Sequence, residues 1–308
     1  MKILMIILGL IWSMVHSLFA STPPQLASQS NYTAGSSVVA VAASKFEPRH
    51  IPTNLRRLPR NQAVYAVKTA GQVSVRAGDR GVSGSTVQSA SQIVQDLSLP
   101  TLKNTLGLAP SQNLNIVLFS AKNTYASALR KAGVPSGSVP ALVANTGGLT
   151  VGSDIWIPLY ALKDKSDLAD VLTHEMTHVI FNQMGIGEKL PTWLNEGTAW
   201  YEGLTAQASV NQAETLRDIT AFHRDVSQAA AAGRLLPLSA NEQQILSAPY
   251  NVEFEDFMAA QYLIQHYGNA SFASFLRQVA NEDVSQSFVS QFHISIGTYE
   301  TSTYRSLM

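Results

Sequence analysis

The chain has 308 residues, and its 21 Lys and Arg balance its 21 Asp and Glu, which gives no bulk reason to expect nucleic acid as a partner. A hydrophobic content of 45% over this length permits one large domain or two small ones. The sequence has no cysteine, which excludes disulfides and thiolate metal ligands and leaves His, Asp and Glu as metal-binding side chains.

The first 62 residues predict an exported chain. Residues 1–20 have the pattern of a secretory signal peptide, with Lys2 before an apolar run that ends at Ala20. Cleavage there predicts a secreted or periplasmic protein without stable membrane insertion. The alternative is an uncleaved anchor, because the run is near the minimum length for a span. Residues 21–62, first rich in Ser and Ala and then in Arg and Pro, are predicted to be a linker or a pro-region.

Residues 63–308 are predicted to form the folded domain, with a mixed lobe to about residue 185 and a helical lobe after it. In the first lobe, hydrophobic patterns predict strands at 64–67, 73–75, 114–119 and 149–160, and helices at 91–97 and 123–132. The Gly- and Ser-rich stretch 78–86 is predicted to be a loop.

Residues 173–178 read THEMTH, which is an HExxH motif. On a helix, His174 and His178 lie about 40° apart, so both rings can hold one metal ion. Glu175 lies next to this pair, where it can take a proton from a water molecule at the metal. The motif therefore predicts a metal centre with a general base beside it.

The surroundings of the motif favour a helix. Ser166 is its predicted N-cap, and Gly185 and Gly187 are its predicted end. Asp170 is either a carboxylate that suits the first turns or a group that orients His174. The apolar positions form one stripe opposite the histidines: Leu168, Leu172, Met176, Val179 and Ile180.

Glu196 is the predicted third ligand, because a catalytic zinc usually takes three protein ligands. It lies 18 positions after His178, in the early turns of a second helix that Pro191 would begin. Antiparallel packing of the two helices would bring the carboxylate back to the histidines. Two other acids are weaker choices, since Glu188 falls in the Gly-containing connection and Glu202 points elsewhere around the helix.

After this site the sequence predicts helices only, at 211–232, 254–267, 271–280, 284–292 and 298–307. Four side chains in this lobe are open candidates for stabilising an oxyanion: Tyr250, Tyr262, His223 and His266. Each alone is more often a packed or surface residue than a catalyst.

The segments LTHEMTHVIF and LPTWLNEGTAWYEG resemble the gluzincins, zinc metallopeptidases whose third ligand is a glutamate, and most of all their peptidase MA-like branch. The resemblance implies an α+β, zincin-like fold, in which a small mixed sheet with an edge strand packs on the HExxH helix ahead of a helical lobe. Residues 149–160 are the candidate edge strand, although an ordinary core strand is an equal alternative. The resemblance also implies one Zn²⁺ held by His174, His178 and Glu196, Glu175 as general base, and a peptide or protein substrate.

One position departs from the resemblance. Trp200 stands four places after Glu196, where thermolysin-like enzymes have an acidic residue. Two alternatives to a peptidase therefore stay open. One is a catalytically silent zincin-fold binding protein of the cell envelope, and the other is a metal-free helical protein with an accidental motif.

Overall fold

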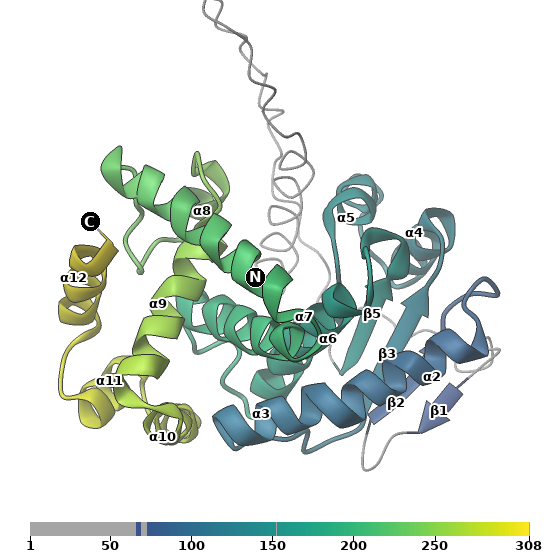
Figure 1. Ribbon diagram of the computed structural model, residues 1–308, viewed down its shortest axis with the longest axis horizontal. Helices are drawn as coiled ribbons and strands as arrows, with labels where there is room; N and C mark the ends of the chain where they lie inside the picture. The colour runs from purple at the N-terminus through teal and green to yellow at the C-terminus, as the bar shows by residue number, and fades with distance from the viewer. Residues whose placement is uncertain (1–65, 69–72, 152, 308) are drawn as a thin grey trace, which may run out of the picture.

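The computed structural model describes residues 66–68, 73–151 and 153–307, which form a mixed α+β structure (Figure 1). The strands are β1 (Ala66–Lys68), β2 (Val73–Ala77), β3 (Leu114–Phe119), β4 (Leu149–Val151) and β5 (Asp154–Pro158). The helices up to the HExxH motif are α2 (Gly84–Ile93), η2 (Val94–Ser98), α3 (Leu99–Leu106), α4 (Lys122–Lys131), α5 (Val139–Asn145), η3 (Leu159–Ala161) and α6 (Lys165–Gln183). The later helices are α7 (Thr192–Ala231), α8 (Glu242–Ser247), α9 (Val252–Tyr267), α10 (Asn269–Val279), α11 (Val284–Phe292) and α12 (Ile296–Leu307).

The predicted signal peptide (1–20) and the linker or pro-region (21–62) lie outside the described residues. Within the described part of the chain, every strand precedes α6 and every element after α6 is a helix. The boundary near residue 185 between two lobes stays a prediction.

The strands form one sheet in the order β1-β2-β3-β5-β4. The three central strands β2, β3 and β5 are parallel, and β1 and β4 pair antiparallel with them at the two edges. Parallel strands need cover on both faces, and β5 is buried along its whole length. The mixed sheet that the sequence predicts is therefore present, with β4 as one edge.

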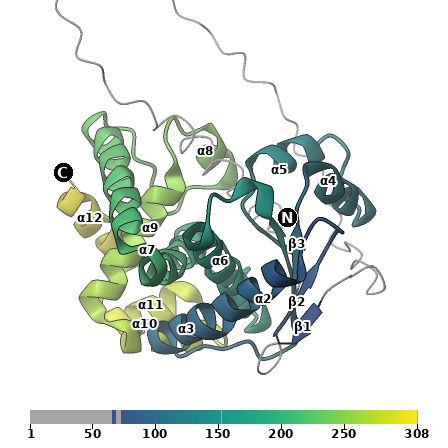
Figure 2. The ribbon, with the colours of Figure 1, turned by 45° about the vertical axis from the view of Figure 1, so that its right-hand side comes forward.

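Helices cover both faces of this sheet (Figure 2). Helices α2 and α6 pack on the face that carries Val75, Ile116 and Ile155. Helices α4 and α5 pack on the opposite face, against Phe119 and Trp156. Because side chains alternate between the faces of a strand, β3 and β5 contribute to both cores. The HExxH helix α6 is thus fixed directly on the sheet.

The single strand predicted over 149–160 is wrong. The segment is a hairpin, in which β4 and β5 pair antiparallel with Thr150 opposite Ile155, followed by the short helix η3. Gly152 and Ser153, both common turn residues, interrupt the alternation at its middle. Within the segment 149–160, β4 is therefore an edge strand and β5 is an interior strand of the sheet.

The N-cap of helix α6 is Asp164, two residues before the predicted N-cap Ser166. Asp164 has an extended backbone, and its Oδ1 accepts hydrogen bonds from the backbone N–H groups of Ser166 (2.7 Å) and Asp167 (3.3 Å). Ser166 is instead buried, and its Oγ lies 2.7 Å from both Oδ1 of Asp164 and Oε2 of Glu214, so its one proton is donated to one of these carboxylates at a time. Asp and Ser cap helices about equally well, so the sequence alone does not separate them. The predicted end is confirmed, with Gly185 at a left-handed φ of 70°.

The predicted loop 78–86 is too long, because α2 already begins at Gly84, and the predicted helix 91–97 is too short at both ends. Ser83 caps α2, its Oγ accepting from the Thr86 N–H at 3.1 Å, and the chain then stays helical to Leu106. The π-helical turn η2 precedes Pro100, which lacks a backbone donor. A strict 3.6-residue pattern overlooks a helix with such a wide turn in its middle.

Helix α7 contains one interruption, at Asn211, whose φ of −147° and ψ of 81° are not helical. The side chain of Asn211 accepts from the Glu214 N–H at 3.3 Å, as an N-cap does. The predicted start of a helix at residue 211 is therefore confirmed in part, because a second helical segment begins there without a loop before it.

Gly197 lies where α7 packs against α9, next to the predicted ligand Glu196. A Cβ atom at Gly197 would lie 2.1 Å from the carbonyl oxygen of Asp256, a backbone atom that cannot move alone. We expect Gly197→Ala to lower the free energy of unfolding by about 3 kcal/mol, the upper part of the range for overpacked sites.

Urea denaturation of the wild type and of the Gly197→Ala variant measures this effect. Gly297→Ala is the matched control, because Gly297 is also helical and a Cβ there meets nothing within 4 Å. Its stability should change by less than about 1 kcal/mol. Equal stability of the two variants would contradict the close contact between α7 and α9.

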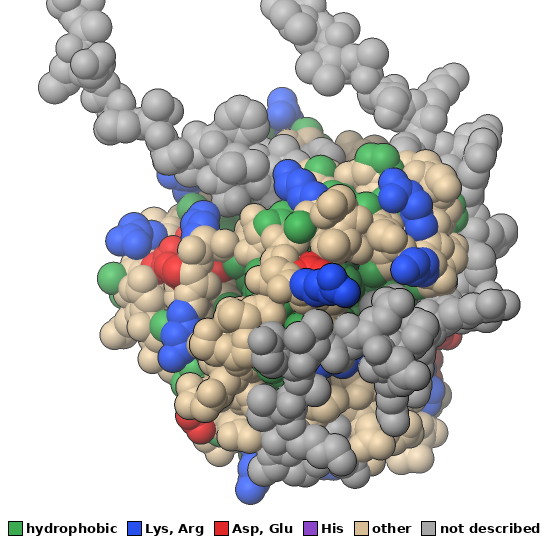
Figure 3. Space-filling model, turned by 90° about the vertical axis from the view of Figure 1, so that its right-hand side faces the viewer, with side chains coloured by type: hydrophobic (Ala, Val, Ile, Leu, Met, Phe, Trp, Pro, Cys, Tyr) green, Lys and Arg blue, Asp and Glu red, His purple; other side chains and the backbone are tan. Residues whose placement is uncertain are grey.

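No helix in the described part of the chain is long and apolar enough to cross a bilayer. On the face in Figure 3, Lys and Arg side chains lie in several separate places among polar and apolar ones. This distribution agrees with the balanced charge of the whole sequence.

Candidate metal centre

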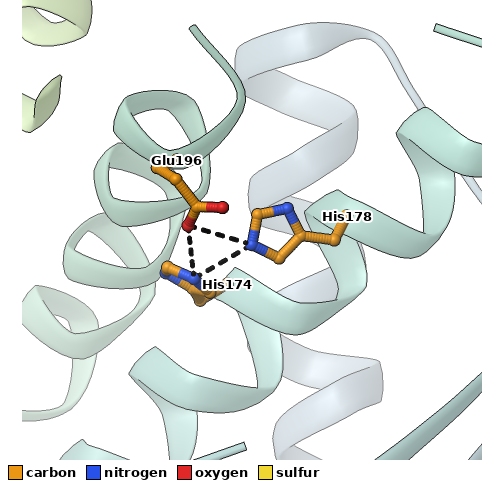
Figure 4. A group of neighbouring side chains, drawn as sticks. All are labelled: His174, His178 and Glu196. Carbon is orange, nitrogen blue, oxygen red and sulfur yellow. Dashed lines mark hydrogen bonds and ion pairs between the residues drawn. The ribbon is translucent and has the colours of Figure 1, made fainter. Parts of the chain in front are cut away.

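Three buried side chains from two helices converge on one point (Figure 4). His174 and His178 come from α6, and Glu196 comes from the beginning of α7. The two Nε2 atoms are 3.1 Å apart. Oε2 of Glu196 lies 3.7 Å from Nε2 of His174 and 3.5 Å from Nε2 of His178. The sequence predicted this set, and the structure brings all three residues together.

The spacing of these atoms fits a metal ion. A triangle with sides of 3.1, 3.5 and 3.7 Å has one point that lies about 2.0 Å from all three corners. That length matches the bonds zinc makes with imidazole nitrogen and carboxylate oxygen. Oε2 of Glu196 is buried without a hydrogen-bond partner among the described residues, and a cation at this point would satisfy it. The group can therefore hold a metal ion.

Asn195 fixes the orientation of His178. Its Nδ2 donates to the carbonyl oxygen of Gly187 at 3.0 Å, so its Oδ1 faces Nδ1 of His178 at 2.9 Å. An amide oxygen only accepts, so Nδ1 carries the proton and Nε2 points at the metal group. Such a bond to the far nitrogen sets both the ring position and the tautomer of a metal-binding histidine. The sequence pattern around Glu196 does not indicate this role of Asn195.

We expect Asn195→Ala to weaken zinc binding by roughly 10- to 100-fold, because the ring of His178 loses its orienting bond. Competition with a chromophoric chelator measures the affinity. Asn195→Asp keeps an acceptor at the same place and should retain more of the affinity than Asn195→Ala. Wild-type affinity in Asn195→Ala would contradict the orienting role.

The charges of the two histidines differ. Burial and the charge on His178 lower the pKa of His174 well below its usual range, so this imidazole is neutral. Burial also disfavours the charged form of His178, but Glu196 more than offsets it and raises the pKa of His178 to about 9. Without a metal, a proton on His178 thus compensates the charge of Glu196. A metal must displace this proton, so binding is linked to proton release.

Glu175 lies under the edge of the sheet. Its Oε2 accepts a hydrogen bond of 2.5 Å from the hydroxyl of Thr150 on β4, and its Oε1 has no hydrogen-bond partner among the described residues. A Cβ at Gly148 would lie 2.8 Å from Oε1, so the backbone before β4 passes directly over this carboxylate. Burial raises the pKa of Glu175 to about 7. This carboxyl group is therefore close to the midpoint of its titration near neutral pH, as suits a general base.

Trp200, four places after Glu196 on α7, packs against the metal group. Its ring lies edge-on to His174 at a centroid distance of 5.3 Å, and its Nε1 donates to Glu253 at 3.1 Å. Glu253 comes from α9 and is buried, and burial with the nearby charge of Glu196 raises its pKa. The carboxyl group of Glu253 is thus linked to His174 through the indole ring of Trp200. Nothing in the spacing around Glu196 indicates Glu253.

The other acids considered from the sequence lie apart from the metal group. Glu188 is exposed. Glu202 is buried, accepts a hydrogen bond of 2.5 Å from the Thr105 hydroxyl, and has a pKa that burial raises to about 8. Asp170 has no hydrogen-bond partner among the described residues, so the suggested bond to His174 is not made.

The four oxyanion candidates do not line the cavities beside the metal group. The hydroxyl of Tyr250 donates to Glu255 and accepts from the backbone N–H of Leu236. Tyr262 stacks on the exposed ring of His266. His223 is exposed on α7. Their positions give none of them a role at the metal group.

The metal group lies between two cavities. Asn195 and Glu196 contribute to the wall of one, with a volume of about 940 Å³. His174, Glu175 and Trp200 contribute to the wall of the other, with a volume of about 260 Å³.

Neither the family models nor the curated proteins compared with this sequence match it. The site is therefore defined by its geometry. It is a buried group of two histidines and a glutamate able to hold a metal ion, with an acid beside it under an edge strand.

Proposed function

We propose that the protein is a zinc-dependent peptidase with a zincin-like fold of the gluzincin kind. The observation that supports this most is the convergence of His174, His178 and Glu196 on one point about 2.0 Å from each donor atom. Such a three-ligand set leaves one position open for water, as catalytic zinc sites do and structural ones do not.

When bound, zinc lowers the pKa of a water molecule to about 7 and polarises a carbonyl group. The chain supplies the proton transfer. Thr150 holds Oε2 of Glu175, which leaves Oε1 to take a proton from water and later give it to the leaving amine. Burial raises the pKa of Glu175 to about 7, and a pKa near neutral suits proton transfer in both directions.

The substrate is proposed to be an extended peptide. Strand β4 is a sheet edge, and its Thr150 touches the general base Glu175. A peptide added along such an edge gains main-chain hydrogen bonds without sequence preference. The two cavities on either side of the metal group would take residues on either side of the cleaved bond. Export by a signal peptide at 1–20, to a secreted or periplasmic location, belongs to the same proposal.

The test uses the full chain, purified without added metal. We expect about one zinc ion per chain by elemental analysis, hydrolysis of casein and of quenched fluorescent peptides, loss of activity with 1,10-phenanthroline, and recovery with zinc. A preparation without divalent metal, whose melting temperature does not rise on adding zinc, would contradict the metal centre itself.

A silent binding protein is the second candidate, and one observation favours it. The four side chains considered for oxyanion stabilisation lie away from both cavities, which leaves that step without an assigned donor. Stoichiometric zinc with no cleavage across a peptide library would support this second function.

A further inference from the structure

The smaller cavity, of about 260 Å³, has an acidic wall that the proposed chemistry does not use. Four aspartates line it, against one lysine and one arginine: Asp167, Asp170, Asp218, Asp225, Lys163 and Arg224. Arg224 is paired with Asp225 at 3.4 Å. The backbone N–H of Lys163 donates to Asp167 at 2.8 Å. Asp170 and Asp218 take part in neither of these two contacts.

These remaining groups form a surplus of hydrogen-bond acceptors. Oδ1 of Asp170 is buried without a hydrogen-bond donor among the described residues, and it lies against Gly203 of α7. Gln207 is 2% exposed and gives its Nε2 to Asp218 at 3.3 Å, which leaves its buried Oε1 without a partner. Buried acceptors without donors are costly. A ligand that brings several N–H donors and a positive charge would satisfy them.

The field of the cavity has the matching sign. Burial and the charges of Asp167 and Asp218 raise the pKa of Asp170 well above its usual range. Burial likewise raises the pKa of Asp218, and the charge of Glu214 adds to it. Carboxylates that repel each other take up a positive charge readily, either as a proton or as a cation.

The rest of the wall suits an aliphatic stem. Trp200, Leu204, Phe222 and Phe254 line the same cavity, and the rings of Phe222 and Phe254 stack at 3.8 Å. A long basic side chain buries its methylene groups on such surfaces and extends its charged end. The volume is below the about 300–1,000 Å³ of pockets that enclose whole small ligands, so one side chain fits it better.

We infer that this cavity is a specificity pocket for a lysine or arginine side chain of the substrate, with Asp170 as its anionic end. The inference rests on the proposed function, because the same cavity is lined by His174 and Glu175. Asp170 precedes His174 by one helical turn, about 6 Å along α6, so the occupant belongs to a residue close to the cleaved bond. An organic cation is favoured over a second metal ion. Among the described residues only His174, His178 and Glu196 bring their donor atoms close enough together to hold a metal ion, and the aspartates of this cavity do not.

The test measures binding and does not need turnover. Zinc-loaded Glu175→Gln protein is titrated with three labelled peptides that differ at one position, which carries arginine, norleucine or glutamate. We expect the arginine peptide to bind at least tenfold tighter than the norleucine peptide, and the glutamate peptide weakest. Adding Asp170→Asn should reduce the arginine preference to twofold or less without changing the norleucine affinity, with zinc content and melting temperature retained.

Asp96→Asn is the matched control, since Asp96 is exposed and lines a different cavity. Should Asp170→Asn fail to fold, Asp218→Asn provides the same comparison. Equal binding of the arginine and norleucine peptides would overturn the inference, as would an arginine preference that survives Asp170→Asn. Selective binding by the variant together with no cleavage by the wild-type protein would refute the peptidase and leave the pocket standing. Cleavage by the wild type without selective binding would do the reverse.

Discussion

Replacing Glu175 with glutamine is expected to lower the rate of peptide hydrolysis by roughly 10²- to 10⁴-fold, the usual contribution of a general acid–base group. The two side chains have nearly the same shape, and the glutamine oxygen can still accept the hydrogen bond from Thr150. The amide cannot take a proton from water near neutral pH, whereas the carboxyl group, with a pKa of about 7, can. The loss should therefore be in kcat, with KM little changed.

The measurement is the kcat/KM of a quenched fluorescent peptide with the zinc-loaded protein. Zinc content and melting temperature should equal those of the wild type, since Glu175 is not one of the three convergent side chains. Glu300→Gln, at a glutamate of α12 that lines neither cavity beside the metal group, is the matched control and should keep full activity. A wild-type rate in Glu175→Gln would remove the proposed mechanism, even if the protein binds zinc.

The metal-binding set is predictable because it follows from short-range geometry. Two histidines four residues apart share a helix face wherever the helix forms. Glu196 needs only one helical return, and the connection between α6 and α7 is short enough to require it. By contrast Thr150 reaches Glu175 across 25 positions, and Glu253 reaches Trp200 across 53. Contacts at such separations depend on the packing of the sheet and of α9, which one sequence does not encode in any local pattern.

The errors in the predicted strands and helices have a similar cause. Strand and helix periods identify β3, α4, α9 and α11 nearly to the residue, because each buries one regular face. The 149–160 segment and the chain from 84 to 106 depart from a single period, one through a turn and one through a π-helical turn.

Removing Glu196 is expected to weaken zinc binding by roughly 10²- to 10³-fold. Structural zinc sites with four ligands have apparent binding free energies of about 10–16 kcal/mol, so one ligand accounts for about 2.5–4 kcal/mol. In Glu196→Ala, His174 and His178 still face each other at 3.1 Å, but the charge that balances the cation is gone. Zinc should consequently raise the melting temperature of the wild type much more than that of the variant.

The comparison with Glu202→Ala makes this prediction specific. Glu202 is also a buried glutamate of α7, so both variants lose the same volume from the same helix. Its carboxylate accepts from Thr105 and takes no part in the convergent group, so its loss should leave the zinc affinity at the wild-type value. Competition titrations against a chromophoric chelator measure the zinc affinities of both variants. If Glu196→Ala binds one zinc ion as tightly as Glu202→Ala does, the third ligand is another residue, and the antiparallel return of α7 to the histidines has a purely structural role.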